Sequence, residues 1–262
     1  MADRVMIGQY VEAYSLIHRL DPRTKLISLL AIMLSFLFLD TLLGFLLATI
    51  LAAAVAMLSR TSFLMLWKVT KPVLLILTFT FVYNALFTEG WELWSWAFIH
   101  VTEEGLRSGA RIVWRIVLLI VLASILTFTT KPLTLAQGLQ KLLSPLSRLH
   151  VPVEQFSLMI VIAIRFIPTI VQELDRILLA QKARGLDRAS LSLMKRIRSY
   201  IPILVPLLFT TIQRAEQLSY AIDARAYGSG QGRTSYYELR LQKIDVVTIG
   251  ITALMVMTLL LV

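Results

Sequence analysis

Long apolar stretches, separated by short polar ones, follow one another along most of this chain. Leu26–Leu39 and Leu42–Leu58 flank the polar pair Asp40-Thr41. As one helix they would be about 50 Å long, against an apolar bilayer core of about 30 Å. The pattern therefore predicts a helical hairpin of two spans. Three further apolar stretches predict spans at Pro72–Phe87, Ile112–Phe128 and Val246–Val262.

The segment between the fourth and fifth predicted spans has a different pattern. Its first part places leucines at alternating steps of four and three residues, at Leu135, Leu139, Leu142, Leu146 and Leu149. This spacing predicts an amphipathic helix with one apolar stripe.

Two longer helices are predicted after it, at Val153–Ala183 and Tyr200–Ala226, each apolar in its first half and charged in its second. We expect the apolar halves to dock under the membrane part and the charged halves to reach into the cytoplasm.

A model with seven spans is the alternative for these two helices. Phe156–Pro168 and Tyr200–Ile212 have a length that suits either a short span or an interfacial helix. However, Arg165 interrupts the first stretch, and Pro202 and Pro206 would kink the second. We therefore favour five spans.

The composition agrees with a polytopic membrane protein of the all-α class. Apolar residues make up 57% of the 262 residues and charged residues 16%, and the mean hydropathy is +0.75. These values exclude a disordered chain, and the presence of 11 Gly and no Cys excludes a collagen-like or disulfide-stapled chain. The predicted organisation is a membrane region at 1–130 with four spans, a cytoplasmic coupling region at 131–243, and a last span at 244–262.

The positive charge is concentrated where the coupling region lies. The net charge of +10 could indicate nucleic-acid binding, but sixteen of the 26 Lys and Arg fall in residues 131–243. The loop Thr88–Gly109 instead carries Glu89, Glu92, Glu103 and Glu104, with Trp91, Trp94 and Trp96 expected at the membrane interface. The positive-inside rule then places the amino terminus and the coupling region in the cytoplasm. The expected partners include the lipid bilayer and exclude nucleic acid.

The sequence contains few residues in patterns that are typical of catalytic or metal sites. It has no Cys, and its histidines, His18, His100 and His150, are scattered, so no metal site is expected. Residues 228–234, Gly-Ser-Gly-Gln-Gly-Arg-Thr, lack the spacing of a phosphate-binding loop. The predicted spans contain no Asp, Glu or Lys that could relay protons. We expect no cofactor and no catalytic residue, so energy for any transport must come from a partner.

A short internal repeat ends both long helices. Ala180-Gln-Lys-Ala183-Arg184-Gly185 and Ala221-Ile-Asp-Ala224-Arg225-Ala226 both have the form Ala-x-x-Ala-Arg-small. The paired alanines would let another surface approach closely, and the arginine offers a rigid fork suited to a carboxylate. A purely structural interpretation is that arginine complements the helix dipole and glycine caps the helix.

These residues resemble a known family. Ala183-Arg184-Gly185 and Ala224-Arg225-Ala226, with Arg165-Phe166-Ile167-Pro168 and Leu20-Asp21-Pro22-Arg23-Thr24-Lys25, are similar to the transmembrane coupling (T) component of energy-coupling-factor transporters. The resemblance covers nearly the whole chain. It implies an importer of vitamins or metal ions, in the cytoplasmic membrane, with two ABC-type ATPase subunits below the T component and a separate S component that captures substrate.

The resemblance also implies roles for individual residues. Arg184 would engage one ATPase subunit and Arg225 the other, flanked by Ala183, Gly185, Ala224 and Ala226. Ala226 departs from the family's glycine, and Gly228 is expected to provide the cap instead. Asp21 and Pro22 are interpreted structurally, as the N-cap and first residue of the first span.

Two functions from other classes compete with this interpretation. A self-sufficient secondary transporter or channel would need polar residues or inverted repeats among the spans, and only Asn84 lies near an outer end. A membrane enzyme acting on lipid or isoprenoid substrates would need paired carboxylates or a nucleophile with its base. The sequence does not name the transported substrate.

Overall fold

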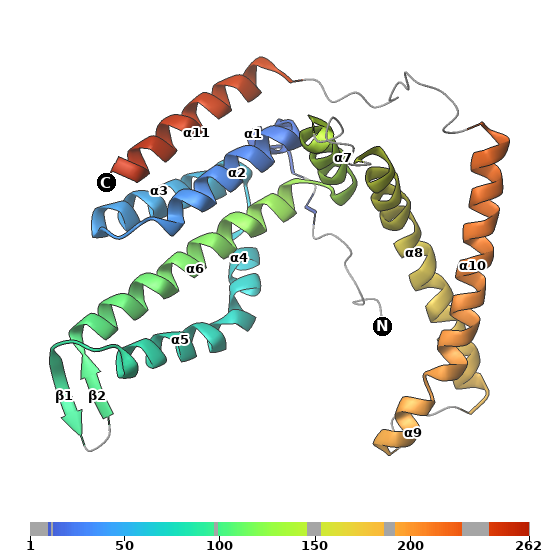
Figure 1. Ribbon diagram of the computed structural model, residues 1–262, viewed down its shortest axis with the longest axis horizontal. Helices are drawn as coiled ribbons and strands as arrows, with labels where there is room; N and C mark the ends of the chain where they lie inside the picture. Colours follow the sequence, from blue (N-terminus) through green and yellow to red (C-terminus); the bar gives the residue numbers. More distant parts are fainter. Residues whose placement is uncertain are drawn as a thin grey trace. The chain divides into compact units, whose positions relative to one another are not determined.

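The computed structural model describes residues 10–11, 13–96, 99–145, 153–185, 192–226 and 241–261. The described chain is helical apart from one short β-hairpin (Figure 1), which confirms the all-α class. It forms two compact units, residues 1–153 with 239–262 and residues 154–238. Five described helical segments are long and apolar enough to cross a membrane: Leu42–Ser59, Phe63–Phe87, Glu103–Thr129, Gln155–Ala183 and Lys243–Leu261.

The first unit begins with the predicted helical hairpin, α2 (Pro22–Leu37) and α3 (Leu42–Ser59). As predicted, Asp21 is the N-cap of α2 and Pro22 its first residue, and the Asp21 carboxylate accepts a hydrogen bond from the Arg23 amide at 2.9 Å. Thr41 caps α3 in the same way through the Gly44 amide. Asp40 and Thr41 therefore form the turn that the polar break predicts.

One of the five predicted spans is not among the five candidate spans, and another segment takes its place. The helix α2 has 16 residues and is about 24 Å long, which is shorter than an apolar core of about 30 Å. The segment Gln155–Ala183, predicted to lie outside the membrane, meets the criterion of length and composition instead. The apolar stretch Leu26–Leu39 continues past the end of the helix, because the helix ends at Leu37.

The next span begins earlier than Pro72. It consists of α4 (Phe63–Thr70), the 3-10 turn η1 (Lys71–Val73) and α5 (Leu74–Phe87). Pro72 lies inside the turn rather than at a helix start. It has no N–H to bond the Lys68 carbonyl, so the regular helical bonding is interrupted there.

The expected loop at Thr88–Gly109 is mostly structured. Strands β1 (Glu92–Trp96) and β2 (Ile99–Thr102) pair antiparallel, and α6 (Glu103–Thr129) follows directly. The expectation that α6 begins at Ile112 was wrong, because Thr102 caps the helix and Glu103 and Glu104 complement its N-terminal dipole. The side chains of Trp94 and Trp96 lie outside the described part of the chain.

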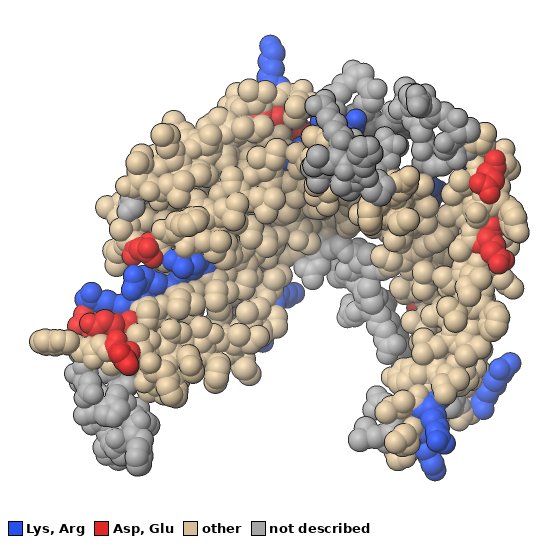
Figure 2. Space-filling view, viewed as in Figure 1, with Lys and Arg blue, Asp and Glu red and all other residues tan. Residues whose placement is uncertain are grey.

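The core of the first unit lies among α2, α3, α6 and the last helix, α11 (Lys243–Leu261). Phe36, Leu122 and Ile125 are fully buried. Helix α5 packs closely on α6, because a Cβ at Gly105 would lie 2.6 Å from the Asn84 carbonyl oxygen. Figure 2 shows a group of charged side chains of this unit at the end where α6 begins, and others where α11 begins.

The amphipathic helix is α7 (Pro132–Leu143), which packs on α2. Gly138 permits this contact, since a Cβ there would lie 3.0 Å from the Pro22 Cβ. Leu146 and Leu149, predicted in the same stripe, lie outside the described residues. A short helix, α1 (Leu16–Arg19), precedes α2.

The second unit contains α8 (Val153–Ala183), α9 (Leu193–Arg198) and α10 (Ile201–Ala224). The bounds of α8 are those predicted, and the helix continues through Pro168. Pro202 lies in the first turn of α10, where proline is tolerated, so the prediction that it kinks the helix was wrong, and only Pro206 lies in the helix interior.

Candidate functional site

The two long helices of the second unit, α8 and α10, run antiparallel (Figure 1). The Gln181 side chain, near the end of α8, donates a hydrogen bond to the Pro202 carbonyl at the start of α10, at 3.2 Å. Further along, the Glu173 carboxylate of α8 lies 3.5 Å from the Arg214 guanidinium of α10. The start of one helix therefore lies beside the end of the other.

The hydrogen bond between Gln181 and Pro202 depends on a proline. In a regular helix, the Pro202 carbonyl would accept from the amide four residues later. That residue is Pro206, which has no N–H, so the carbonyl is left free. The Gln181 amide supplies the missing donor and ties the two helices together.

The antiparallel arrangement corrects the predicted placement of the helix halves. We expected the apolar halves of both helices at the membrane and both charged halves in the cytoplasm. The contacts instead place the apolar first half of α8 beside the second half of α10, so the two apolar halves lie at opposite ends of the pair. Arg184 and Arg225, at the C-terminal ends of α8 and α10, therefore also lie at opposite ends of the helix pair.

The first of these ends is formed by Ala183, Arg184 and Gly185. The Arg184 amide donates to the Ala180 carbonyl at 3.1 Å and the Gly185 amide to the Lys182 carbonyl at 3.0 Å. Gly185 has a φ of +84°, which is the left-handed conformation that ends many helices. A side chain at this position would meet no atom within 4 Å, so only the backbone favours glycine.

The second end, formed by Ala224, Arg225 and Ala226, has the same backbone form. The Ala226 amide donates to the Asp223 carbonyl at 2.9 Å, and Ala226 itself has a φ of +50°. Ala226 itself thus adopts the left-handed conformation that Gly185 adopts at the first end, and the expected cap at Gly228 stays a prediction. Gly228 lies outside the described residues.

All six of these residues are exposed. Among the described residues, no ion pair is recorded for Arg184 or Arg225, whereas Arg176 and Arg214 both lie near the Glu173 carboxylate, at 3.7 Å and 3.5 Å. The guanidinium groups at the two ends are thus available to a carboxylate on another surface.

A groove of about 490 Å³ lies between the first half of α8 and the end of α10. Arg225 and Ala221 line it from α10, and Arg165 and Phe166 line it from α8. The structure thus brings together the second arginine end and the motif Arg165-Phe166-Ile167-Pro168. Two guanidinium groups in one groove favour an acidic ligand or partner there.

A buried polar cluster in the first unit, around Lys25 and Asp245, was not predicted from the sequence. Lys25 is 4% exposed and Asp245 is 1% exposed. The Lys25 ammonium donates to the Thr129 carbonyl at 2.9 Å and to the Thr130 hydroxyl at 3.3 Å. The Asp245 carboxylate accepts from the amides of Asp21, at 2.9 Å, and Gln242, at 2.7 Å.

The position of this cluster gives it a role in anchoring the chain. Thr130 lies just before α7 and Gln242 just before α11, so the cluster fixes both ends of the segment that contains the second unit. In the sequence, Lys25 and Asp245 each stand at the edge of an apolar stretch, where a charged residue is usually part of an ordinary loop. This position alone did not indicate that the two side chains are buried. In the described part of the chain, no three His, Cys, Asp or Glu side chains gather closely enough to hold a metal ion.

Comparison with known proteins identifies similar chains. Residues 13–236 match the CbiQ family, described as a cobalt transport protein. The "Energy-coupling factor transporter transmembrane protein EcfT" of Ruminiclostridium cellulolyticum is 41% identical over 249 residues, covering 95% of this chain and 93% of that protein. The proteins of the same name from Thermanaerovibrio acidaminovorans and Bacillus subtilis are 41% and 40% identical, covering 98% and 91% of this chain and 95% and 91% of their own lengths.

Proposed function

The chain belongs to the family of the energy-coupling factor transporter transmembrane protein EcfT, and from this we propose that it couples two ABC-type ATPase subunits to a substrate-binding S component. The observation that carries the proposal is the pair of exposed arginine ends at opposite ends of one antiparallel helix pair. The subunit itself has no catalytic role in this proposal.

Each arginine end contacts one ATPase subunit. The left-handed residue after each arginine ends the helix, so the guanidinium group projects from a helix end with its neighbours small. A carboxylate in a groove of the ATPase can accept two parallel hydrogen bonds from such a group. Arg225 lies beside Arg165, and Arg184 lies about 29 Å further along the axis of α8, so the two ends are far enough apart to reach two separate subunits.

The antiparallel pair converts ATPase motion into a change within the second unit. ATP binding closes the ATPase pair, and the closure moves the two arginine ends relative to one another. The helices are joined by the Gln181–Pro202 hydrogen bond and the Glu173–Arg214 ion pair, so this movement changes how α8 crosses α10. The crossing change is then transmitted to the S component.

The S component contacts apolar side chains of the second unit and of α7. Phe156 and Met159 of α8 are 58% and 63% exposed, and Leu208 and Phe209 of α10 are 60% and 63% exposed. Such large exposed apolar side chains indicate a membrane or protein contact. The imported substrates are vitamins or metal ions, and the S component recognises them.

The chain is a multi-pass protein of the cytoplasmic membrane, with its amino terminus and the coupling helices in the cytoplasm. The support is the distribution of Lys and Arg, sixteen of which fall in residues 131–243. Helix α8 is apolar enough to span a membrane, but its ion pair with α10 at Glu173 favours a place at the cytoplasmic interface.

Affinity purification from membranes tests the proposal. Tagged wild-type chain is expected to retain two ABC-type ATPase subunits and ATPase activity. The Arg184→Ala/Arg225→Ala variant is expected to lose both, because each lost charged contact weakens an interface by at least about tenfold. Each single variant should weaken retention of one subunit.

The matched control is Arg19→Ala/Arg60→Ala, which removes two exposed positive charges of the first unit and should retain the ATPases. Insertion of every variant in the membrane is checked by fractionation. Substrate uptake by the double arginine variant at the wild-type rate would contradict the proposal, as would a wild-type chain that transports substrate alone.

A further inference from the structure

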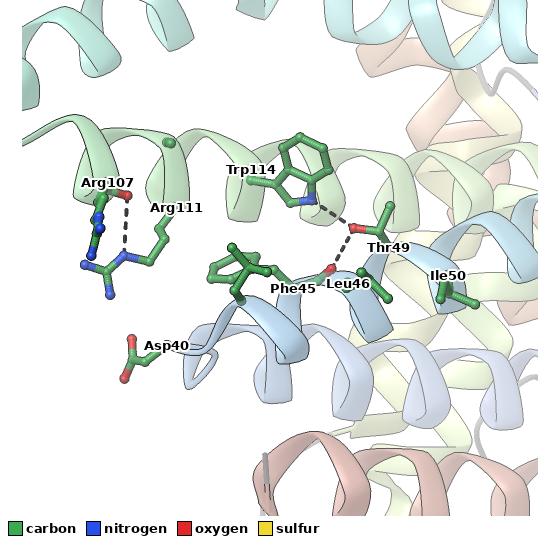
Figure 3. Close-up of a pocket in the computed structure, with 10 residues that line it drawn as sticks. Asp40, Phe45, Leu46, Thr49, Ile50, Arg107, Arg111 and Trp114 are labelled. Carbon is green, nitrogen blue, oxygen red and sulfur yellow. Dashed lines mark hydrogen bonds between the residues drawn. The ribbon is translucent and has the colours of Figure 1, made fainter. Parts of the chain in front are cut away.

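A second cavity lies in the first unit, between α3 and α6 (Figure 3). It encloses about 840 Å³, within the range of about 300–1,000 Å³ that small-molecule sites occupy. Its walls are mainly apolar and include Leu42, Phe45, Leu46, Ile50, Ala110 and Trp114. Both helices are long and apolar enough to span a membrane, and a groove between two spanning helices is within reach of lipid.

The polar atoms in the apolar wall are already satisfied. The Trp114 indole N–H donates to the Thr49 hydroxyl at 2.9 Å, and that hydroxyl donates to the Phe45 carbonyl at 2.7 Å. A ligand segment without hydrogen-bonding groups therefore fits this part of the groove. An acyl chain is such a segment, and a bilayer provides it in high concentration.

One end of the groove is charged. Figure 3 shows Arg107 and Arg111 together there, with Asp40 opposite them. Arg107 pairs with Glu103, and Asp40 lies 3.6 Å from Arg115. The Nε atom of Arg111 donates to the Arg107 carbonyl at 3.4 Å, and no ion pair is recorded for Arg111 within the described residues. The mouth therefore carries one positive charge without a recorded acidic partner.

The charged mouth lies at the level of lipid headgroups. Arg111 directly precedes the apolar stretch Ile112–Phe128, and Trp114 follows one turn later on the same face of α6. Arginine and tryptophan at the edge of an apolar stretch are typical of the membrane–water interface. The apolar part of the groove then extends from the headgroup level towards the bilayer centre.

We propose that this groove binds one phospholipid with a net negative headgroup. The phosphodiester lies on the Arg111 guanidinium, and an acyl chain follows Leu46 and Ile50 along α3. Charge complementarity favours this occupant over a zwitterionic lipid, because the mouth has an uncompensated positive charge. The proposal is independent of the ATPase contacts, which lie on the second unit.

Native mass spectrometry of the detergent-solubilised full chain tests the proposal by titration with dioleoyl phosphatidylglycerol and dioleoyl phosphatidylcholine. One phosphatidylglycerol per chain should bind about fivefold more tightly than phosphatidylcholine, as expected for one arginine at a membrane surface. Arg111→Gln should reduce phosphatidylglycerol binding to the level of phosphatidylcholine. Ile50→Trp, which fills the groove, should weaken both lipids, whereas the control Arg60→Gln at the other end of α3 should change neither.

Three results would overturn the proposal. Equal binding of both lipids by wild type would remove the role of charge. Competition by inorganic phosphate as effective as that by phosphatidylglycerol would show an anion site that does not use the apolar groove. Loss of the bound lipid whenever a second membrane protein co-purifies, with that protein cross-linking to the groove, would show that the groove is a protein interface.

Discussion

The two left-handed helix ends predict opposite effects for reciprocal substitutions. Gly185 has a φ of +84° and Ala226 a φ of +50°, although both occupy the position after the arginine. A side chain added at Gly185 meets nothing within 4 Å, so Gly185→Ala changes only backbone energy. Gly185→Ala should therefore destabilise the end of α8, and Ala226→Gly should stabilise the end of α10.

The magnitude follows from two opposing contributions. A left-handed conformation costs a residue with a Cβ about 1–2 kcal/mol. Alanine restricts the unfolded chain more than glycine does, which offsets about 0.4–1 kcal/mol of this cost. The net change is about 0.5–1 kcal/mol, of opposite sign at the two ends. Local hydrogen exchange should then change about two- to fivefold.

Hydrogen–deuterium exchange of the last helical turn measures this effect. The reporting amides are those of Arg184 and Gly185 in one variant and those of Arg225 and residue 226 in the other. Ala215→Gly is the control, because Ala215 is exposed in the interior of α10. Glycine there costs about 1 kcal/mol relative to alanine, so this substitution should speed exchange, opposite to Ala226→Gly. Faster exchange at the end of α10 in Ala226→Gly would refute the reasoning.

Three further predictions concern the helix pair, the buried cluster and pH. Gln181→Leu leaves the Pro202 carbonyl without its donor and should destabilise the second unit by about 1 kcal/mol, measured by hydrogen exchange. Lys25→Met removes the buried ammonium and should destabilise the first unit by about 3 kcal/mol in thermal unfolding, whereas an unchanged melting temperature would refute the anchoring role. Burial lowers the pKa of His18 below 6.5, and the charge of Lys25 adds to this. Stability should therefore be complete above pH 6.5 and fall below it, a slope absent from His18→Gln.

Local patterns allowed a large part of the fold to be predicted from the sequence. The hairpin turn at Asp40-Thr41 and the N-cap at Asp21 follow from short-range capping and apolar spacing. The bounds of α8 follow from its continuous helical pattern. The start of α6 was predicted too late, because Glu103 and Glu104 were taken as loop charges rather than as residues of a first helical turn.

Contacts between distant residues were less accessible. The Asp21 amide reaches the Asp245 carboxylate only because α2 packs on α11, and neither residue's neighbours in the sequence indicate this. The antiparallel pair α8 and α10 includes a hydrogen bond from Gln181 to the carbonyl that Pro206 leaves free, more than twenty residues away in the sequence. The arginine ends were identified by their repeated sequence, but their placement at opposite ends needed these contacts.

The most direct test of the central claim is site-specific cross-linking in membranes. The chain has no Cys, so Ala183→Cys and Ala224→Cys each introduce one reactive site beside an arginine end. With a thiol-attached photo-cross-linker, both variants should cross-link to ABC-type ATPase subunits, while the control Ala110→Cys in the first unit should not. Cross-linking of neither helix end to an ATPase, in membranes that contain the assembled transporter, would contradict the coupling role.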